Sequence, residues 1–178
     1  MIDTVRLVLF LALSAGAVGA SLGAWRNQQV YGYYRFFAFE AIVLLIVLNA
    51  GHWFQDPFSI RQIASWTLLA IATAVAVHGA YLLRVIGKAQ ERGIEDTLTV
   101  VEVGAYRYIR HPLYASLMLL AWGTFFKGVD LLSGGLAFVA TSLLVATGRY
   151  EERFNVDRFG AAYEEYMKRT KMFVPFVL

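Results

Sequence analysis

Five apolar stretches, separated by short polar connections, constrain this chain more than any other feature of its sequence. They cover residues 5–25, 36–54, 63–86, 113–126 and 129–147. A helix needs about 20 apolar residues to cross the hydrocarbon core of a bilayer, and four of the stretches reach or approach that length. The fourth stretch has 14 residues and is short for a full crossing. The pattern predicts an all-α integral membrane protein with five transmembrane helices.

The composition favours the same class of protein. Hydrophobic residues make up 58% of the chain and charged residues 16%, whereas soluble domains average about 25% charged residues. The absence of cysteine excludes disulfide bonds, thiolate metal sites and cysteine nucleophiles. At 178 residues the chain is expected to form one membrane domain, with three spans in residues 1–86 and the functional core in residues 87–178.

With five spans, the basic residues gather on one face of the membrane. That face carries the connections 26–35 and 84–111 and the C-terminal tail, which together hold 13 of the 16 Lys and Arg residues. The positive-inside rule makes this face cytoplasmic, so the N-terminus is expected outside and the C-terminus inside. Topology explains these charges without a nucleic-acid partner, and the lipid bilayer is the expected surrounding.

Two hydrophilic segments are expected on the cytoplasmic face. Residues 87–110 end in a β-prone run and predict an extended strap before the fourth span. Residues 149–171 carry aromatic side chains at three- and four-residue steps, which predicts an amphipathic helix that is weakened at Gly160. The Lys127-Gly128 connection is so short that the last two spans are expected to form a tight hairpin.

The fourth span begins at His111-Pro112, in a stretch rich in tyrosine and arginine. Proline suits the first turn of a helix because the amide that it lacks would have no intrahelical partner there. Tyr114 follows His111 by three residues, so the two side chains share one face of the helix. The histidine either caps the helix at the membrane interface or belongs, with Arg110 and Tyr114, to a site for a cation that carries polar groups.

Glu151 and Glu152 directly follow the fifth span and also admit two interpretations. Acidic residues favour a helix N-terminus because of the helix dipole. Alternatively, a carboxylate at the membrane interface binds an ammonium group or ribose hydroxyls. Because the hairpin places the start of the fourth span beside the end of the fifth, His111, Tyr114 and Glu151 are expected within reach of one ligand. The sequence has no glycine-rich phosphate loop, Rossmann fingerprint or serine-nucleophile motif, and its three histidines are too dispersed for a metal site.

The order and spacing of these residues match a known family. The pattern is Gly104-x-Tyr106-x-Tyr108-x-Arg110-His111-Pro112-x-Tyr114, followed by Glu151-Glu152 and Phe159-Gly160-x-x-Tyr163-x-x-Tyr166. It closely resembles the isoprenylcysteine carboxyl methyltransferase (ICMT) family, which belongs to a wider group of integral-membrane methyltransferases that includes phospholipid methyltransferases. The resemblance covers roughly residues 91–175.

The resemblance implies a methyltransferase that uses S-adenosylmethionine and releases S-adenosylhomocysteine. The cofactor would bind in a cytoplasmic pocket within residues 87–178, without a metal. The acceptor would be small and lipophilic, resembling a prenylcysteine carboxylate or a lipid, and would enter from the bilayer. The residues that the resemblance places along the cofactor are Leu98, Thr99, Val100, Val101, Tyr106, His111, Pro112, Leu113, Tyr114 and Glu151.

One position departs from the family pattern. Many members have an arginine four residues before the first of the paired glutamates, thought to hold the carboxylate of the acceptor, and here that position is Thr147. Arg149 is offset by two residues, which rotates a side chain by about 200° on a helix. Either the helix is irregular there or the acceptor is not a prenylcysteine carboxylate, and we favour the second explanation. Arg110 or Arg149 is expected to position the acceptor.

Two other functions remain open at this point. One is a membrane binding or scaffold protein that has the same fold and no catalytic activity. The other is a reductase, because some membrane sterol reductases share a similar C-terminal region. Those reductases use a nicotinamide cofactor and have additional spans, for which this chain is short.

Overall fold

The computed structural model describes residues 4–88 and 97–175, and the regular secondary structure in these ranges is helical. Within them, six α-helices and two short 3-10 helices follow one another. Their bounds are α1 (Thr4–Arg26), α2 (Val30–Asn49), η1 (Ala50–His52), α3 (Ile60–Val85), η2 (Gly104–Arg107), α4 (Pro112–Phe125), α5 (Leu131–Phe159) and α6 (Ala161–Arg169). The described residues contain no β-strand, only an isolated parallel bridge between Ile109 and Lys171. The predicted all-helical class is confirmed.

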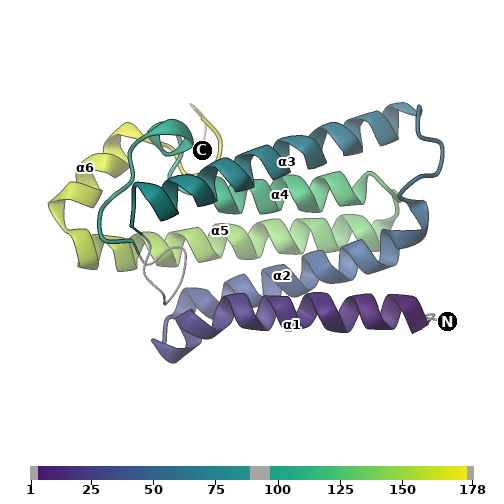
Figure 1. Ribbon diagram of the computed structural model, residues 1–178, viewed down its shortest axis with the longest axis horizontal. Helices are drawn as coiled ribbons and strands as arrows, with labels where there is room; N and C mark the ends of the chain where they lie inside the picture. Colours follow the sequence, from purple (N-terminus) through teal and green to yellow (C-terminus); the bar gives the residue numbers. More distant parts are fainter. Residues whose placement is uncertain (1–3, 89–96, 176–178) are drawn as a thin grey trace.

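The five long helices lie side by side, and α6 packs at one end of them (Figure 1). α2 packs extensively against α5, and α3 packs extensively against α4. α4 and α5 form the predicted hairpin, and α1 lies at the edge of the bundle, against α2. The lateral order is therefore α1, α2, α5, α4, α3, with α6, η2 and the connection before α4 gathered at one end.

Four helices are long and apolar enough to cross a membrane: α1, α2 with η1, α3 and α5. α4 is apolar but has 14 residues, which agrees with the short fourth stretch of the sequence. The chain is therefore a multi-pass membrane protein, while a crossing by α4 remains a prediction.

The second helix begins at Val30, six residues before the predicted boundary. The connection from α1 is short, and Gln28 adopts a positive φ of 54° within it. Tyr31 and Tyr34 were expected in a polar turn, but they belong to α2 and pack on α5. Tyr34 stacks on Tyr150 at 5.2 Å between ring centroids. Burial of these aromatic rings against α5 outweighs their preference for an interfacial turn.

The C-terminal hydrophilic segment also differs from the prediction of one amphipathic helix over residues 149–171. α5 continues without a break from the apolar core to Phe159, and a separate helix, α6, begins after Gly160. Gly160 has a φ of +58°, a conformation that glycine adopts readily, so the predicted weak point is where the helix ends. Glu151 and Glu152 consequently lie inside α5 rather than at a helix N-terminus, and their interpretation as helix-dipole residues is wrong.

The predicted strap over residues 87–110 is described only in part, because residues 89–96 lie outside the described ranges. Residues 97–103 form neither helix nor strand. Leu98 donates a backbone hydrogen bond to the carbonyl of Gly87, which closes the connection against the end of α3. η2 then leads the chain to Ile109 and into α4.

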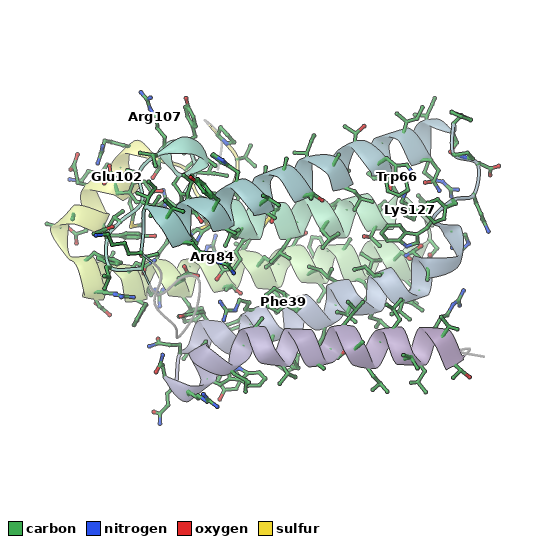
Figure 2. The ribbon with its side chains drawn as sticks, in the orientation of Figure 1. Phe39, Trp66, Arg84, Glu102, Arg107 and Lys127 are labelled. Carbon is green, nitrogen blue, oxygen red and sulfur yellow. The ribbon has the colours of Figure 1, made fainter. Side chains whose placement is uncertain are left out.

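The end of the bundle that lies opposite α6 is held by a buried lysine. Lys127 is fully buried, and its Nζ donates to Gln62 Oε1 at 2.8 Å. The ammonium also lies 3.5 Å from the ring centroid of Trp66, and Figure 2 shows the two side chains together. An ammonium over an indole face gains a cation–π interaction, which is strongest where water is excluded. The α4–α5 connection is thereby fixed to α3.

We predict that Gly128→Ala destabilises this end of the bundle. A Cβ at Gly128 would overlap Asn49 Oδ1. Asn49 cannot move freely, because its Nδ2 donates to Leu45 O and Ser133 Oγ, both at 3.0 Å. The expected loss is about 1–3 kcal/mol, measured by thermal unfolding in detergent.

Gly135→Ala is the matched control, because a Cβ there meets no atom within 4 Å in the interior of α5. Alanine at a helix interior is expected to stabilise by roughly 0.5–1 kcal/mol relative to glycine. Equal stability of the two variants would contradict the tight approach of the α4–α5 connection to α2.

Candidate functional site

A pocket opens where the start of α4, the end of α5 and the helix α6 meet, at the end of the bundle that carries α6 in Figure 1. Residues 97–107 and the end of α3 complete its walls. The described residues that line it are Leu83, Thr97, Val100, Val101, Tyr106, Arg110, His111, Leu113, Tyr114, Glu151, Asn155, Phe159, Tyr163 and Tyr166. Apolar and aromatic side chains dominate, with a few polar groups among them, as in most sites for small organic ligands.

The His111-Pro112 sequence sets where α4 begins and therefore where the side chains of His111 and Tyr114 lie. Pro112 occupies the first turn of α4, and His111 precedes it with a non-helical backbone (φ −123°, ψ 61°). The imidazole is 5% exposed and stacks on Tyr114 at 5.5 Å between ring centroids. The Tyr114 hydroxyl donates a short hydrogen bond to Glu151 Oε2. The hairpin therefore brings His111, Tyr114 and Glu151 together, as the sequence predicted.

Arg110 holds the floor of the pocket together. Its Nε donates to Glu152 Oε1 at 2.5 Å, and its Nη1 donates to the carbonyls of Met167 and Thr170. The side chains of Arg110 and Glu152 are only 10% and 9% exposed. The carboxylate balances the charge of this buried guanidinium, and the carbonyls accept the hydrogen bonds of Nη1. Charge-assisted hydrogen bonds of this kind are strong and directional. Arg110 thus connects the start of α4 to α5 and to the chain after α6.

The chain that follows α6 returns beneath the start of α4. The amide of Arg110 donates to Lys171 O at 2.8 Å, the amide of His111 to Met172 O at 3.1 Å, and the amide of Lys171 to Tyr108 O at 3.0 Å. This backbone pairing positions Phe173, whose ring centroid lies 5.7 Å from that of His111. We call residues 170–173 the return segment. It was absent from the predictions, because no local pattern marks a pairing across 60 residues of sequence.

Two tyrosines of α6 form the outer wall. Tyr163 and Tyr166 are 4% and 3% exposed, and the Tyr166 hydroxyl donates to the carbonyl of Tyr106 at 2.7 Å. Burial raises the pKa of both phenols well above their usual value. They therefore stay protonated in the physiological range and act as hydrogen-bonding groups rather than as charges.

Most of the predicted site residues line this pocket. They are Val100, Val101, Tyr106, Arg110, His111, Leu113, Tyr114 and Glu151. Three predicted cofactor residues do not: Leu98 is 56% exposed, Thr99 is exposed, and Pro112 is buried in the bundle. The remaining prediction, Arg149, lies on an exposed face of α5, beside a separate groove that it shares with Arg153 and Asp157.

The structure around Thr147 excludes one of the two explanations that the sequence left open, an irregular helix. α5 is a continuous helix there, so an irregular helix does not carry Arg149 into the place of the family's arginine. Thr147 is fully buried, and its Oγ1 donates to Leu143 O at 2.8 Å. Among the described lining residues, Arg110 is the one cationic side chain, and its Nε and Nη1 already have partners.

Six lining residues were not predicted as site residues: Leu83, Thr97, Asn155, Phe159, Tyr163 and Tyr166. Helical spacing alone could have found two of them, because Asn155 and Phe159 follow Glu151 by four and eight residues and share its face of α5. Tyr163 and Tyr166 belong to the family pattern, but no role was assigned to them. Leu83 and Thr97 line the pocket because the connection after α3 folds back on the end of that helix. No sequence pattern around either residue predicts this contact.

Comparison with known proteins places the chain in a family context. The family described as "Protein of unknown function (DUF1295)" matches residues 18–170. The curated relatives include proteins named methanethiol S-methyltransferase and protein-S-isoprenylcysteine O-methyltransferase. The resemblance to the ICMT family is confirmed.

Three relatives illustrate the extent of the likeness. The methanethiol S-methyltransferase of Pseudomonas deceptionensis is 33% identical over 150 residues, which are 73% of this chain and 55% of that protein. The protein of the same name from Pseudomonas sp. (strain GM41(2012)) is 33% identical over 113 residues, 62% of this chain and 42% of that protein. Protein-S-isoprenylcysteine O-methyltransferase B of Arabidopsis thaliana is 28% identical over 127 residues, 71% of this chain and 62% of the relative. The chain thus spans about half the length of the curated relatives it matches.

We predict that Arg110→Lys loosens the pocket floor and releases the return segment. Lysine keeps the charge, but its three donors sit on one nitrogen, so it cannot reproduce the bonds that Arg110 makes from Nε and from Nη1. The expected loss of stability is about 2 kcal/mol, with faster tryptic cleavage near residue 171.

Arg169→Lys is the control, because the exposed Arg169–Glu102 pair is 57% and 38% exposed and such pairs contribute at most about 1 kcal/mol. Equal cleavage rates of the two variants and the unaltered protein would rule out Arg110 as the group that holds the return segment.

Proposed function

The chain belongs to the DUF1295 family, and on that premise we propose that it is an integral-membrane methyltransferase that uses S-adenosylmethionine and a small lipophilic acceptor. The observation that carries the proposal is the pocket in which the hairpin joins His111 and Tyr114 to Glu151. Relatives named as S- and O-methyltransferases support the same class of reaction. These names alone do not identify the acceptor.

The chemistry of the pocket fits the proposed cofactor. S-adenosylmethionine combines a sulfonium cation, an ammonium group, ribose hydroxyls and an aromatic base. Glu151 offers a nearly buried carboxylate to a cation or a hydroxyl, and the rings of His111 and Tyr114 offer faces that attract a cation. Val101 and Leu113 offer apolar contacts to the base.

The cofactor would supply a methyl group activated by its positive sulfur. The residues of the chain then need to hold the acceptor in line with that group and to keep water out, because positioning and desolvation provide most of the rate enhancement in such a displacement. α6 supplies Tyr163 and Tyr166 to the outer wall of the pocket, and both side chains are almost completely buried. No nucleophilic residue is required by this chemistry.

We further propose that the acceptor is uncharged, and that a small thiol is the first candidate. A carboxylate would need a free cation, and the described lining offers only Arg110, whose Nε and Nη1 already bond Glu152 and the return segment. Thr147 stands buried where the family's arginine would hold a carboxylate. Relatives named for methanethiol agree with this choice.

The pocket is proposed to lie at the cytoplasmic membrane surface. All five long helices would cross, with the N-terminus outside, because this arrangement puts 13 of the 16 basic residues on the side of the pocket. The 14 residues of α4 extend about 21 Å, less than the hydrocarbon core of about 30 Å. The start of α4 therefore sits below the lipid surface, and an acceptor dissolved in the bilayer can reach it sideways.

The first test of this function is binding of the cofactor product. Glu151→Gln removes the negative charge and keeps the shape, so affinity for S-adenosylhomocysteine is expected to fall roughly 10- to 100-fold in calorimetry on the detergent-solubilised protein. Glu164→Gln, on the exposed side of α6, is expected to bind as the unaltered protein does. Unchanged affinity in Glu151→Gln would remove Glu151 from the site.

The second test is turnover. With methyl-labelled S-adenosylmethionine, we expect transfer to a small alkanethiol and little transfer to a prenylcysteine carboxylate. Saturable binding of S-adenosylmethionine without transfer to thiols, prenylcysteines or a membrane lipid extract would support a binding protein instead. Displacement of S-adenosylhomocysteine by NADPH would support a reductase.

A further inference from the structure

We propose that His111 is a catalytic residue that accepts the proton of the acceptor, with Glu152 as its positioning residue. The inference rests on the proposed methyl transfer and specifies how the proton of the acceptor is removed. It goes beyond a role in cofactor binding, which His111 would share with several other lining residues.

An uncharged thiol requires such a proton acceptor. During the transfer, the sulfur of the thiol forms a bond to the methyl carbon, and the donor's bond to that carbon breaks, returning its electron pair to the donor sulfur. The S–H bond of the acceptor also breaks, and its proton must leave. The thiolate is the stronger nucleophile, so a base that takes this proton as the methyl group moves lowers the barrier. A carboxylate acceptor, by contrast, would carry no proton to remove.

The orientation of His111 suits this task. Its Nε2 lies 3.3 Å from Glu152 Oε1, and the edge that carries Cδ2 and Nε2 faces Gly148 on α5. A Cβ at Gly148 would come within 3.4 Å of Cδ2. The opposite edge of the ring carries Nδ1, which makes no hydrogen bond to any described residue. Nε2 is completely enclosed and has no hydrogen-bond partner among the described residues, and His111 lines the pocket, so we assign Nδ1 as the nitrogen that a ligand there would meet.

Glu152 prepares the imidazole for this role. The Nε2–Glu152 contact is not aligned as a hydrogen bond, but the carboxylate 3.3 Å away attracts a proton to Nε2, which leaves the lone pair of Nδ1 to accept the proton of the acceptor. When Nδ1 takes the proton, the imidazolium gains a charge partner at 3.3 Å. Arg110 fixes the same carboxylate oxygen at 2.5 Å and thereby fixes the geometry of the pair. Arg110, Glu152 and His111 form a chain of contacts that ends in the pocket.

The other titratable groups around His111 are poor candidates for accepting a proton from the acceptor. Glu151 accepts the hydrogen bond of Tyr114, and Arg110 is a cation. Burial raises the pKa of Tyr163 and of Tyr166, so both phenols keep their protons. Tyr106 lines the pocket as a further phenol on η2. Among these residues, His111 is the one whose ring offers a neutral nitrogen as a proton acceptor.

The test compares two acceptors of different acidity on the full chain in lipid nanodiscs. At pH 7.5 an alkanethiol is almost entirely protonated, whereas an aryl thiol is mostly thiolate and needs no base. His111→Gln keeps a polar side chain of similar size. We expect it to reduce transfer to the alkanethiol by roughly 100- to 10,000-fold and transfer to the aryl thiol by about tenfold or less. His52→Gln, an exposed histidine at the other end of the bundle, is the control and is expected to leave both rates unchanged.

The comparison separates proton removal from cofactor binding, because weaker binding of S-adenosylmethionine would lower both rates by the same factor. Equal losses with the two thiols would therefore overturn the inference while leaving the proposed function intact. Transfer to neither thiol by the unaltered protein would overturn the proposed acceptor and this inference with it.

A second variant keeps the test valid should His111→Gln fail to fold. Glu152→Gln leaves His111 in place and removes its charge partner, so a selective loss with the alkanethiol, smaller than that of His111→Gln, is expected. Raising the pH toward the pKa of the alkanethiol should restore part of its rate in either variant, because the solution then supplies thiolate. A loss in Glu152→Gln that is equal for both thiols and independent of pH would contradict the role of the pair.

Discussion

The guanidinium of Arg110 is the interaction on which the functional end of this protein depends. It bonds Glu152 on α5 and two carbonyls at the end of α6, while its own amide pairs with the return segment. Three segments far apart in sequence thus meet at one side chain. Removing a partner from a buried charge of this kind lowers stability, so the pocket floor depends on the carboxylate and the carbonyls together.

The two ends of the bundle solve the same problem of burying a cation in different ways. At the pocket end the partner is the carboxylate of Glu152, which also lies 3.3 Å from His111 Nε2. At the far end Lys127 has a neutral amide and an indole face, which fix a connection without offering a titratable partner. Between the ends, the fully buried Ala121, Ala137 and Ala140 lie in one apolar core cluster with residues of α2, and small side chains of this kind permit close packing of helices.

Apolar length and residue spacing were sufficient to predict the helices, the α4–α5 hairpin and the meeting of His111, Tyr114 and Glu151. Prediction failed where a long-range contact replaced a local preference. Tyr31 and Tyr34 belong to α2 because they pack on Phe154 and Tyr150 of α5. α5 extends past its apolar part because nothing breaks it before Gly160. The return segment and Leu83 enter the site through backbone pairing and chain closure, which leave no periodic trace in a single sequence.

Thr147 and Gly148 occupy the part of α5 that faces His111, so these two small residues affect both the position of the histidine and the charges available to an acceptor. A Cβ at Gly148 would come within 3.0 Å of the Phe173 ring and would also crowd His111, so glycine is what lets both rings pack against α5. An arginine at 147 would bring a second cation to this face of α5, one turn before Glu151. With threonine at position 147, the groups near the Glu152 carboxylate are Arg110 and His111. The negative charge of Glu152 therefore acts on the imidazole of His111. In the reaction proposed above, the lack of a cation for a carboxylate acceptor and the presence of a base for a protonated one both follow from this local packing.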